Sequence, residues 1–149
     1  MSATKEYAGR TTVTVDRSKA EIEHILKRWG ADQFAYGWRE TSAMVGFRID
    51  QRQVRLTLPL PAEGTNVRAF EAECRQRWRA LALVIKAKLA AIDAGISTIE
   101  DEFLTGLLLP DGQSVGEWVR PQVARAYATG VMPPSLPGIP APSTNARIA

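Results

Sequence analysis

Apolar side chains alternate with small or polar ones over three consecutive stretches in the first half of the chain. Phe34, Tyr36 and Trp38 form the first set, and residues 45–49 and 54–60 continue the same period of two. This period is typical of strands with one buried face. The connections between the stretches are short and polar, so adjacent strands should pair as antiparallel hairpins.

A short strand and a helix are predicted ahead of this hairpin region. Residues 11–15 form a β-branched run, Thr-Thr-Val-Thr-Val, which favours a strand. Ser18 and Glu21 have the spacing of a capping box, and apolar residues recur at helical spacing over residues 22–29. The predicted order is therefore β-α-β-β-β.

A long amphipathic helix is predicted from about Val67 to Asp93, a stretch without proline or glycine and rich in strong helix formers. The residues that share its apolar face are Phe70, Cys74, Trp78, Leu81, Ile85, Leu89 and Ile92. Such a face covers one side of a sheet. We therefore expect an α+β domain in which an antiparallel sheet is covered by the first helix and by this long helix.

Two shorter helices and a tail complete the predicted architecture. Ser97 with Glu100, and Ser114 with Glu117, have capping-box spacing, and each pair should open a helix. From Val131 onward the chain is rich in proline and nearly uncharged, which predicts an extended tail.

The length of 149 residues suits one domain. We expect residues 1–10 to be a flexible N-terminus, residues 11–130 to form a single α+β domain, and residues 131–149 to form the proline-rich extended tail. The chain lacks an apolar stretch long enough to span a bilayer and begins without a signal peptide. These features predict a cytoplasmic protein with no membrane partner.

The composition offers little for catalysis. One cysteine and one histidine, Cys74 and His24, preclude an internal disulfide and the usual zinc ligand sets. The acidic residues 100–102 fall in the first turn of a predicted helix, where carboxylates meet the helix dipole favourably. No glycine-rich phosphate loop has the required spacing. We therefore expect no enzyme activity, no metal and no cofactor.

Several segments carry a family resemblance. They are Leu109-Pro-Asp-Gly-Gln-Ser-Val-Gly-Glu-Trp-Val-Arg-Pro-Gln-Val, the following Ala-Tyr-Ala-Thr-Gly-Val-Met-Pro-Pro, Arg77-Trp-Arg-Ala-Leu and Phe34-Ala-Tyr-Gly-Trp. Together they resemble a family of small proteins of tailed phages and prophages, over most of residues 11–134. The resemblance implies a mobile-element setting, in which accessory proteins serve DNA replication, recombination or the defeat of host defences. It transfers no catalytic residue.

The basic residues are unevenly distributed, although the net charge is only +3. On the long helix, Arg68, Arg75, Arg79 and Lys86 lie within about 20° of one line, at 100° per residue. A phosphate backbone is able to follow such a row. The alternative is a solvated helix face whose arginines pair with Glu71 or with the acidic C-terminal helices.

The sheet offers a second basic surface. If the aromatic residues of the first hairpin strand point inward, the opposite face carries Arg39, Arg48, Gln53, Arg55 and Thr57. Open sheets that hold single-stranded nucleic acid usually expose aromatic side chains for base stacking, so ordinary surface arginines are the alternative. If the first hairpin strand had the opposite alternation of inward and outward residues, those aromatic residues would be exposed. The aliphatic alternation of the next two strands argues against this arrangement.

Two functions of different classes remain open. The first is a non-enzymatic phage or prophage accessory protein that binds DNA or RNA. Its expected contacts are Arg39, Arg48, Arg55, Arg68, Arg75, Arg79 and Lys86. The second is an inhibitor that binds a host defence or replication protein through the acidic helices or the tail. Either protein would act in the bacterial host cytoplasm, and a second copy of the chain is a further candidate partner.

Overall fold

Three strands, four α-helices and one 3-10 turn make up the described part of the chain. The computed structural model describes residues 2–133, with side chains from residue 15 onward. The elements are α1 Ser2–Arg28, β1 Gln33–Arg39, β2 Ser42–Ile49, β3 Arg52–Pro59, α2 Val67–Asp93, α3 Ile99–Glu102, η1 Leu104–Gly106 and α4 Val115–Thr129. The predicted α+β class is confirmed, as are the three hairpin strands and the long helix.

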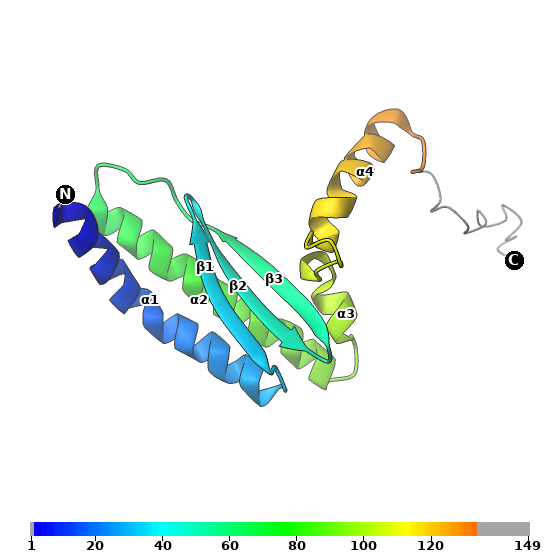
Figure 1. Cartoon of the computed structure of the whole chain (residues 1–149), viewed down its shortest axis with the longest axis horizontal. Coiled ribbons are helices and arrows are strands. Elements are labelled where there is room, and N and C mark those ends of the chain that lie inside the picture. The colour runs from blue at the N-terminus through cyan, green and yellow to red at the C-terminus, as the bar shows by residue number, and fades with distance from the viewer. Residues whose placement is uncertain (1, 134–149) are drawn as a thin grey trace, which may run out of the picture.

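Two tight turns join the strands into an antiparallel sheet of order β1-β2-β3. Glu40, Asp50 and Gln51 lie in these turns with φ angles of 42°, 48° and 63°, the left-handed conformation that two-residue hairpin turns favour. Figure 1 shows α1 and α2 packed side by side on one face of the sheet and running in the same direction. The opposite face, called the outer face below, is turned toward the viewer.

The core lies between the sheet and the two long helices. β2 buries every second residue, namely Ala43, Val45, Phe47 and Ile49. The helices add Ile22, Leu26, Trp78, Ala82, Ile85 and Leu89 to the same cluster. Trp78 is 4% exposed and Cys74 is 1% exposed. The predicted burial of these two side chains on the apolar face of α2 is therefore confirmed.

α1 extends much further toward the N-terminus than the sequence predicted, and the strand expected at residues 11–15 is wrong. Val15, the last residue of that run, is buried and shares one helical face with Ile22 and Leu26, seven and eleven residues later. Packing of this face against α2 outweighs the weak strand preference of the β-branched run. The helix start expected at Ser18 is also wrong, because Ser18 lies inside α1.

The caps of the two C-terminal helices agree with the sequence to within one residue. Ser114 accepts a hydrogen bond from the Glu117 backbone N–H at 3.1 Å, and the Glu117 carboxylate accepts one from the Ser114 N–H at 2.9 Å, so the predicted capping box is confirmed. At α3 the cap is Thr98, which accepts from the Asp101 N–H at 3.1 Å, in place of the predicted Ser97.

The segment after α3 covers the edge of β3. Leu108 N–H donates to the Gln53 carbonyl at 2.8 Å, and Leu107 forms a bridge with Val54. Gly106 permits this close approach, since a Cβ atom there would lie 2.8 Å from the Arg55 carbonyl oxygen. Val115 N–H then donates to the Leu107 carbonyl at 2.8 Å. This segment positions the start of α4, which extends away from the sheet in Figure 1.

The two chain ends differ in what the structure describes. Residues 2–10, expected to precede the first ordered element, belong to α1. The predicted extended tail falls almost wholly on residues 134–149, which lie outside the described residues. Over the described part of the chain, no helix has the length and apolar character needed to cross a membrane.

Replacing Trp78 with alanine should destabilise the domain by about 3–5 kcal/mol, the usual cost of removing a buried tryptophan from a core. The loss includes the contact with the Tyr36 ring, whose centroid lies 6.1 Å away. Chemical denaturation followed by circular dichroism measures this free energy of unfolding. Leu83→Ala is the control on the same helix, because Leu83 is 59% exposed and should change stability by less than about 1 kcal/mol. Equal effects of the two substitutions would contradict this description of the core.

Candidate nucleic-acid interface

The seven predicted contact residues lie on two different surfaces. Arg39, Arg48 and Arg55 belong to the outer face of the sheet, as the sequence predicted. The other four lie on α2, in the helical layer behind the sheet. The structure therefore does not bring the seven residues together into one basic patch.

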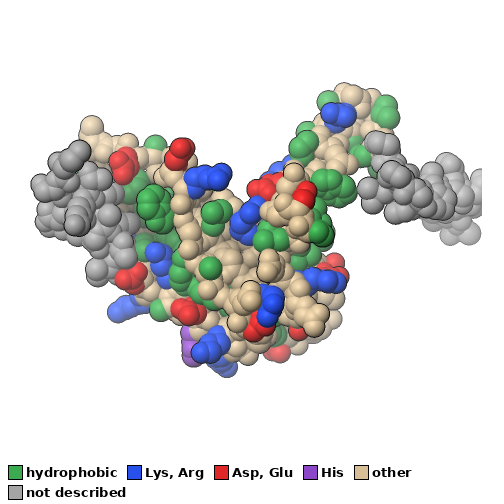
Figure 2. Space-filling view, viewed as in Figure 1, with side chains coloured by type: hydrophobic (Ala, Val, Ile, Leu, Met, Phe, Trp, Pro, Cys, Tyr) green, Lys and Arg blue, Asp and Glu red, His purple; other side chains and the backbone are tan. Residues whose placement is uncertain are grey.

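Strand register aligns the outer-face residues in rows across the sheet. From the β2–β3 turn upward, the first three rows are Gln33, Arg48 and Gln53; then Ala35, Gly46 and Arg55; then Gly37, Met44 and Thr57. The middle of this face therefore has almost no side chains on β1 and β2. In Figure 2 the backbone and small or polar residues of this face form a tan area between blue and green side chains.

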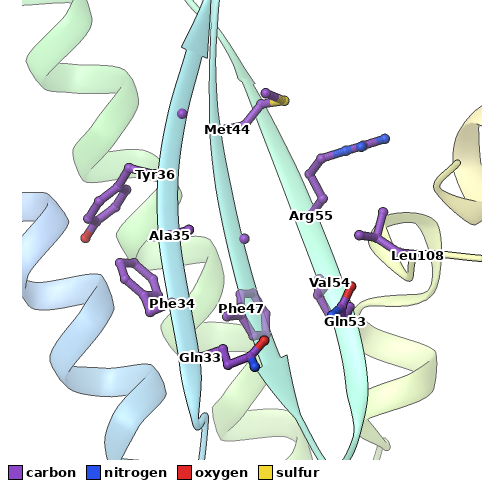
Figure 3. A pocket seen from close by; sticks show the side chains of 12 residues that line it. Gln33, Phe34, Ala35, Tyr36, Met44, Phe47, Gln53, Val54, Arg55 and Leu108 are labelled. Atoms are coloured by element: carbon purple, nitrogen blue, oxygen red, sulfur yellow. The ribbon is translucent and has the colours of Figure 1, made fainter. Parts of the chain in front are cut away.

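A hollow of about 520 Å³ occupies the part of the outer face that lacks side chains. Figure 3 shows Gln33 and Gln53 at one end of this outer-face hollow, Met44 toward the other end, and Arg55 and Leu108 along its β3 side. Ala35, Gly37 and Gly46 form the floor. The volume is within the range of small-molecule and cofactor sites.

Arg48 is held in place by an acidic neighbour. Its Nε donates to Asp32 Oδ1 at 2.9 Å, and its second terminal nitrogen contacts the other carboxylate oxygen, which makes a bidentate pair. This hydrogen bond holds the pKa of Asp32 below its ordinary value and raises that of Arg48. The pair fixes the Arg48 guanidinium at the turn end of the outer face and compensates its charge.

Arg55 is also paired, and its partner comes from α4. One terminal nitrogen of Arg55 contacts Glu117 Oε2 at 2.7 Å. The Ser114 backbone N–H, and then the charge of Arg55, hold the pKa of Glu117 below its ordinary value. Arg39 differs from both, because its guanidinium has no hydrogen bond or ion pair among the described residues. Of the three sheet arginines, Arg39 alone thus carries an uncompensated charge in this part of the chain.

The basic row on α2 also contains both paired and unpaired cations among the described residues. Lys86 makes an ion pair with Glu21 of α1, so the Lys86 end of the row faces the neighbouring helix. Arg68 and Arg79 are exposed and Arg75 is half-buried, and none of these three has an ion pair among the described residues. The stretch of α1 that precedes Glu21 has no acidic residue between Glu6 and Asp16. Glu71, the partner expected for these arginines, has a buried carboxylate oxygen without a hydrogen bond, and neither it nor any other described carboxylate makes an ion pair with the three arginines.

The aromatic residues of β1 lie on the helix side of the sheet, as predicted. The Tyr36 ring packs edge-on against Phe34, with centroids 4.5 Å apart, and its hydroxyl donates to the Lys19 carbonyl. Burial raises the pKa of the Tyr36 hydroxyl. Trp38 is nevertheless 83% exposed, since it lies near the hairpin end of the strand. The outer face has no aromatic stacking platform.

The residues considered for catalysis in the sequence are exposed, buried or paired with cations. His24 is exposed on α1, and Cys74 is buried, which raises the pKa of its thiol. Glu100 pairs with Arg52 at 2.9 Å, and Glu102 lies 3.7 Å from Lys88. Among the residues with described side chains, no three acidic, histidine or cysteine groups are arranged to hold a metal ion.

Sequence reasoning placed Gln53 on the outer face but missed the hollow beside it. The missed residues are Gln33, Ala35, Gly37, Met44, Gly46 and Leu108. The signal available in the sequence was the pair of glycines inside predicted strands, because glycine weakens a strand and marks places where another group approaches the backbone closely. The sequence did not indicate Leu108, because its position depends on the backbone contacts that hold Leu107 and Leu108 along the edge of β3.

Comparison with known proteins adds no relative: no family model, no curated protein and no solved structure matches the chain. The resemblance to small tailed-phage and prophage proteins therefore remains a prediction from the quoted segments.

The Arg48 pair gives a pH-dependent prediction. In the folded protein the side chain of Asp32 should titrate below the ordinary aspartate range, because Arg48 stabilises its charged form. Its contribution to stability should therefore be present above the unfolded-state pKa and lost as the pH falls through the folded-state value. Carbon-detected NMR titration of the carboxyl group measures this value. Arg48→Gln should raise the pKa toward the ordinary value, whereas Arg52→Gln, which breaks a neighbouring pair, should leave it unchanged. An unaltered titration in Arg48→Gln would contradict the assignment.

Proposed function

We propose that this chain is a non-enzymatic accessory protein of a phage or prophage that binds nucleic acid in the bacterial host cytoplasm. The observation that supports the proposal best is the row of Arg68, Arg75 and Arg79 on α2. Aligned arginines without carboxylate partners attract phosphate groups, whereas paired arginines contribute little net charge.

The dimensions of the row suit a nucleic-acid strand. Arg68 and Arg79 are eleven residues apart on one helix, which corresponds to about 16 Å at 1.5 Å per residue. This length corresponds to about five nucleotides at the axial rise of 3.4 Å per nucleotide in a duplex strand. Arg75 lies between them on the same line, so a single backbone is able to contact all three. Contacts of this kind hold phosphates and do not distinguish sequences.

The pairing of the other cations refines the predicted set. Lys86 belongs to an ion pair with Glu21, so it marks the end of the basic row. Arg48 and Arg55 are oriented by Asp32 and Glu117 on the outer face, and of the two only Arg55 lines the outer-face hollow. In this proposal the α2 row supplies most of the phosphate affinity, and the paired sheet arginines contribute orientation more than charge.

One observation favours the alternative function, an inhibitor that binds a host protein. α4 extends from the domain and exposes large apolar side chains, with Trp118 at 42%, Val123 at 45% and Tyr127 at 90% exposure. Exposed aromatic residues on one helix are typical of helix-in-groove recognition of a partner protein. The acidic residues expected to dock have other roles, since Glu100, Glu102 and Glu117 all pair with cations of the same domain. Val123 and Tyr127, which lie within about 40° of each other around the helix at 100° per residue, would therefore supply the docking surface in the alternative.

Binding to DNA or RNA should weaken steeply as salt rises, because phosphate contacts release counterions. Fluorescence anisotropy with labelled single- and double-stranded 20-nucleotide DNA and with RNA, at several salt concentrations, measures the affinity. Arg75→Glu with Arg79→Glu should weaken binding to every probe and flatten the salt dependence by about two units, one for each lost phosphate contact. The thermal melting temperature should remain nearly unchanged.

The matched control carries the same change of charge at a distance from the row. Lys27→Glu with Arg125→Glu should retain most of the parental affinity and its salt dependence. If the parent binds none of the probes, or if the two double variants lose affinity equally, the α2 row is not the binding surface. A defined complex with a host protein that Tyr127→Ala abolishes, in the absence of any nucleic-acid binding, would establish the alternative.

A further inference from the structure

Gly37 and Gly46 lie in the middle of strands where neither the backbone nor the packing requires glycine. Their φ angles are not positive. A Cβ atom on Gly46 would come no closer than 3.9 Å to another residue, and one on Gly37 would meet only the flexible end of Met44 at 3.6 Å. Glycine in a strand interior is destabilising relative to alanine. The two glycines therefore weaken the sheet without a structural reason.

Six other glycines in the described part of the chain have clear structural roles. At Gly106 and Gly116 a Cβ atom would collide with a backbone oxygen at 2.8 Å and 2.9 Å. Gly30, Gly95, Gly112 and Gly130 have positive φ angles, which other residues rarely adopt. What sets Gly37 and Gly46 apart is their common location, because both form the floor of the outer-face hollow. A floor without side chains leaves the peptide planes of β1 and β2 accessible to a flat group.

The rim of the hollow limits the class of ligand. Gln33 and Gln53 at one end present carboxamides, which both donate and accept hydrogen bonds, and neither side chain has a hydrogen bond among the described residues. Met44 and Leu108 add apolar walls, and Arg55 lies along the β3 side. A flat ring with donors and acceptors on its edge matches the open floor, the two carboxamides and the apolar walls, and the Arg55 side chain, held by Glu117, borders the same space. A nucleobase in a nucleic-acid strand has this chemistry.

We propose that the outer-face hollow holds one unstacked base of a single-stranded nucleic acid, lying flat over Gly37 and Gly46 with its edge toward Gln33 and Gln53. This proposal rests on the proposed function and specifies its ligand. In a duplex the faces of a base are covered by its neighbours, so the hollow selects single strands. The α2 row lies in the other layer of the molecule. A strand of 20 nucleotides is about 68 Å long even at the 3.4 Å axial rise of a duplex strand, so it is long enough to reach both surfaces.

Other ligand classes fit the hollow less well. An aliphatic chain would leave the two carboxamides of Gln33 and Gln53 without partners. A peptide that adds to the sheet needs an open strand edge, whereas the floor of the hollow is the face of two paired strands, and the β3 edge is covered by Leu107 and Leu108. A small anion alone would not use the flat apolar floor.

The test fills the hollow without removing any contact from the core. Gly46→Val adds a strand-favouring side chain where a Cβ atom fits, so the variant should melt at or above the parental temperature. Gly64→Val is the control, because a Cβ atom at Gly64 in the loop before α2 would also meet nothing within 4 Å. The probe is a 20-nucleotide single strand with 2-aminopurine at its centre, whose emission rises when the base leaves the stack. A matching duplex and free adenosine monophosphate complete the set.

The parent should raise the 2-aminopurine emission of the single strand and bind it more tightly than the duplex. Gly46→Val should abolish the rise and weaken single-strand binding by about tenfold, the effect of losing one base contact, with unchanged duplex affinity. Gly64→Val should behave as the parent. Gln33→Ala with Gln53→Ala should reduce the emission change without altering the melting temperature.

Each contrary outcome identifies what has failed. If the parent binds no nucleic acid, the proposed function and the base site are both wrong. If the parent binds but Gly46→Val binds the single strand with full affinity and full emission change, only the base site is wrong. If Gly46→Val fails to fold, Gly37→Val provides the same test. If adenosine monophosphate displaces the strand at equal concentration, the hollow is a free-nucleotide site and the assignment to a polymer is overturned.

Discussion

Burial of every second residue of β2 is the constraint on which the rest of the structure depends. Ala43, Val45, Phe47 and Ile49 face α1 and α2, so the residues between them must face outward. Hairpin register then assigns β1 and β3 to the same two faces. A shift by one residue would bury Arg48 and expose Phe47. The same alternation that forms the core therefore places Gly46 and the sheet arginines on the opposite surface.

Most of the fold was predictable because its signals are local. The hairpin strands follow from a period of two, and α2 follows from helical spacing with Cys74, Trp78 and Ile85 on the face that is buried. The strand predicted at residues 11–15 failed because β-branched residues resemble a strand when no partner is considered. Only the packing of α1 against α2, across a large sequence separation, shows that Val15 belongs to a helix.

The candidate site was less predictable, since charge patterns do not reveal which cations have partners. The outward positions of Arg48 and Arg55 followed from strand alternation, but their carboxylate partners Asp32 and Glu117 depend on turns and on the placement of α4. The alignment of Arg75 with Arg79 followed from helix geometry alone. That Lys86 meets Glu21 of α1 required knowing that the two long helices lie side by side.

The arrangement of α1 also determines an order of assembly during synthesis. The hairpins of the sheet join residues close in sequence and can close soon after they leave the ribosome. Of the described elements α1 is made first, but its contact between Glu21 and Lys86 spans 65 residues, and its apolar face with Ile22 and Leu26 is covered completely only when α2 joins it on the sheet. An emerging chain therefore carries a partly uncovered apolar helix until residues 67–93 of α2 have been translated. Although α1 precedes the sheet and α2 in the chain, it is among the last of the described elements to complete its packing.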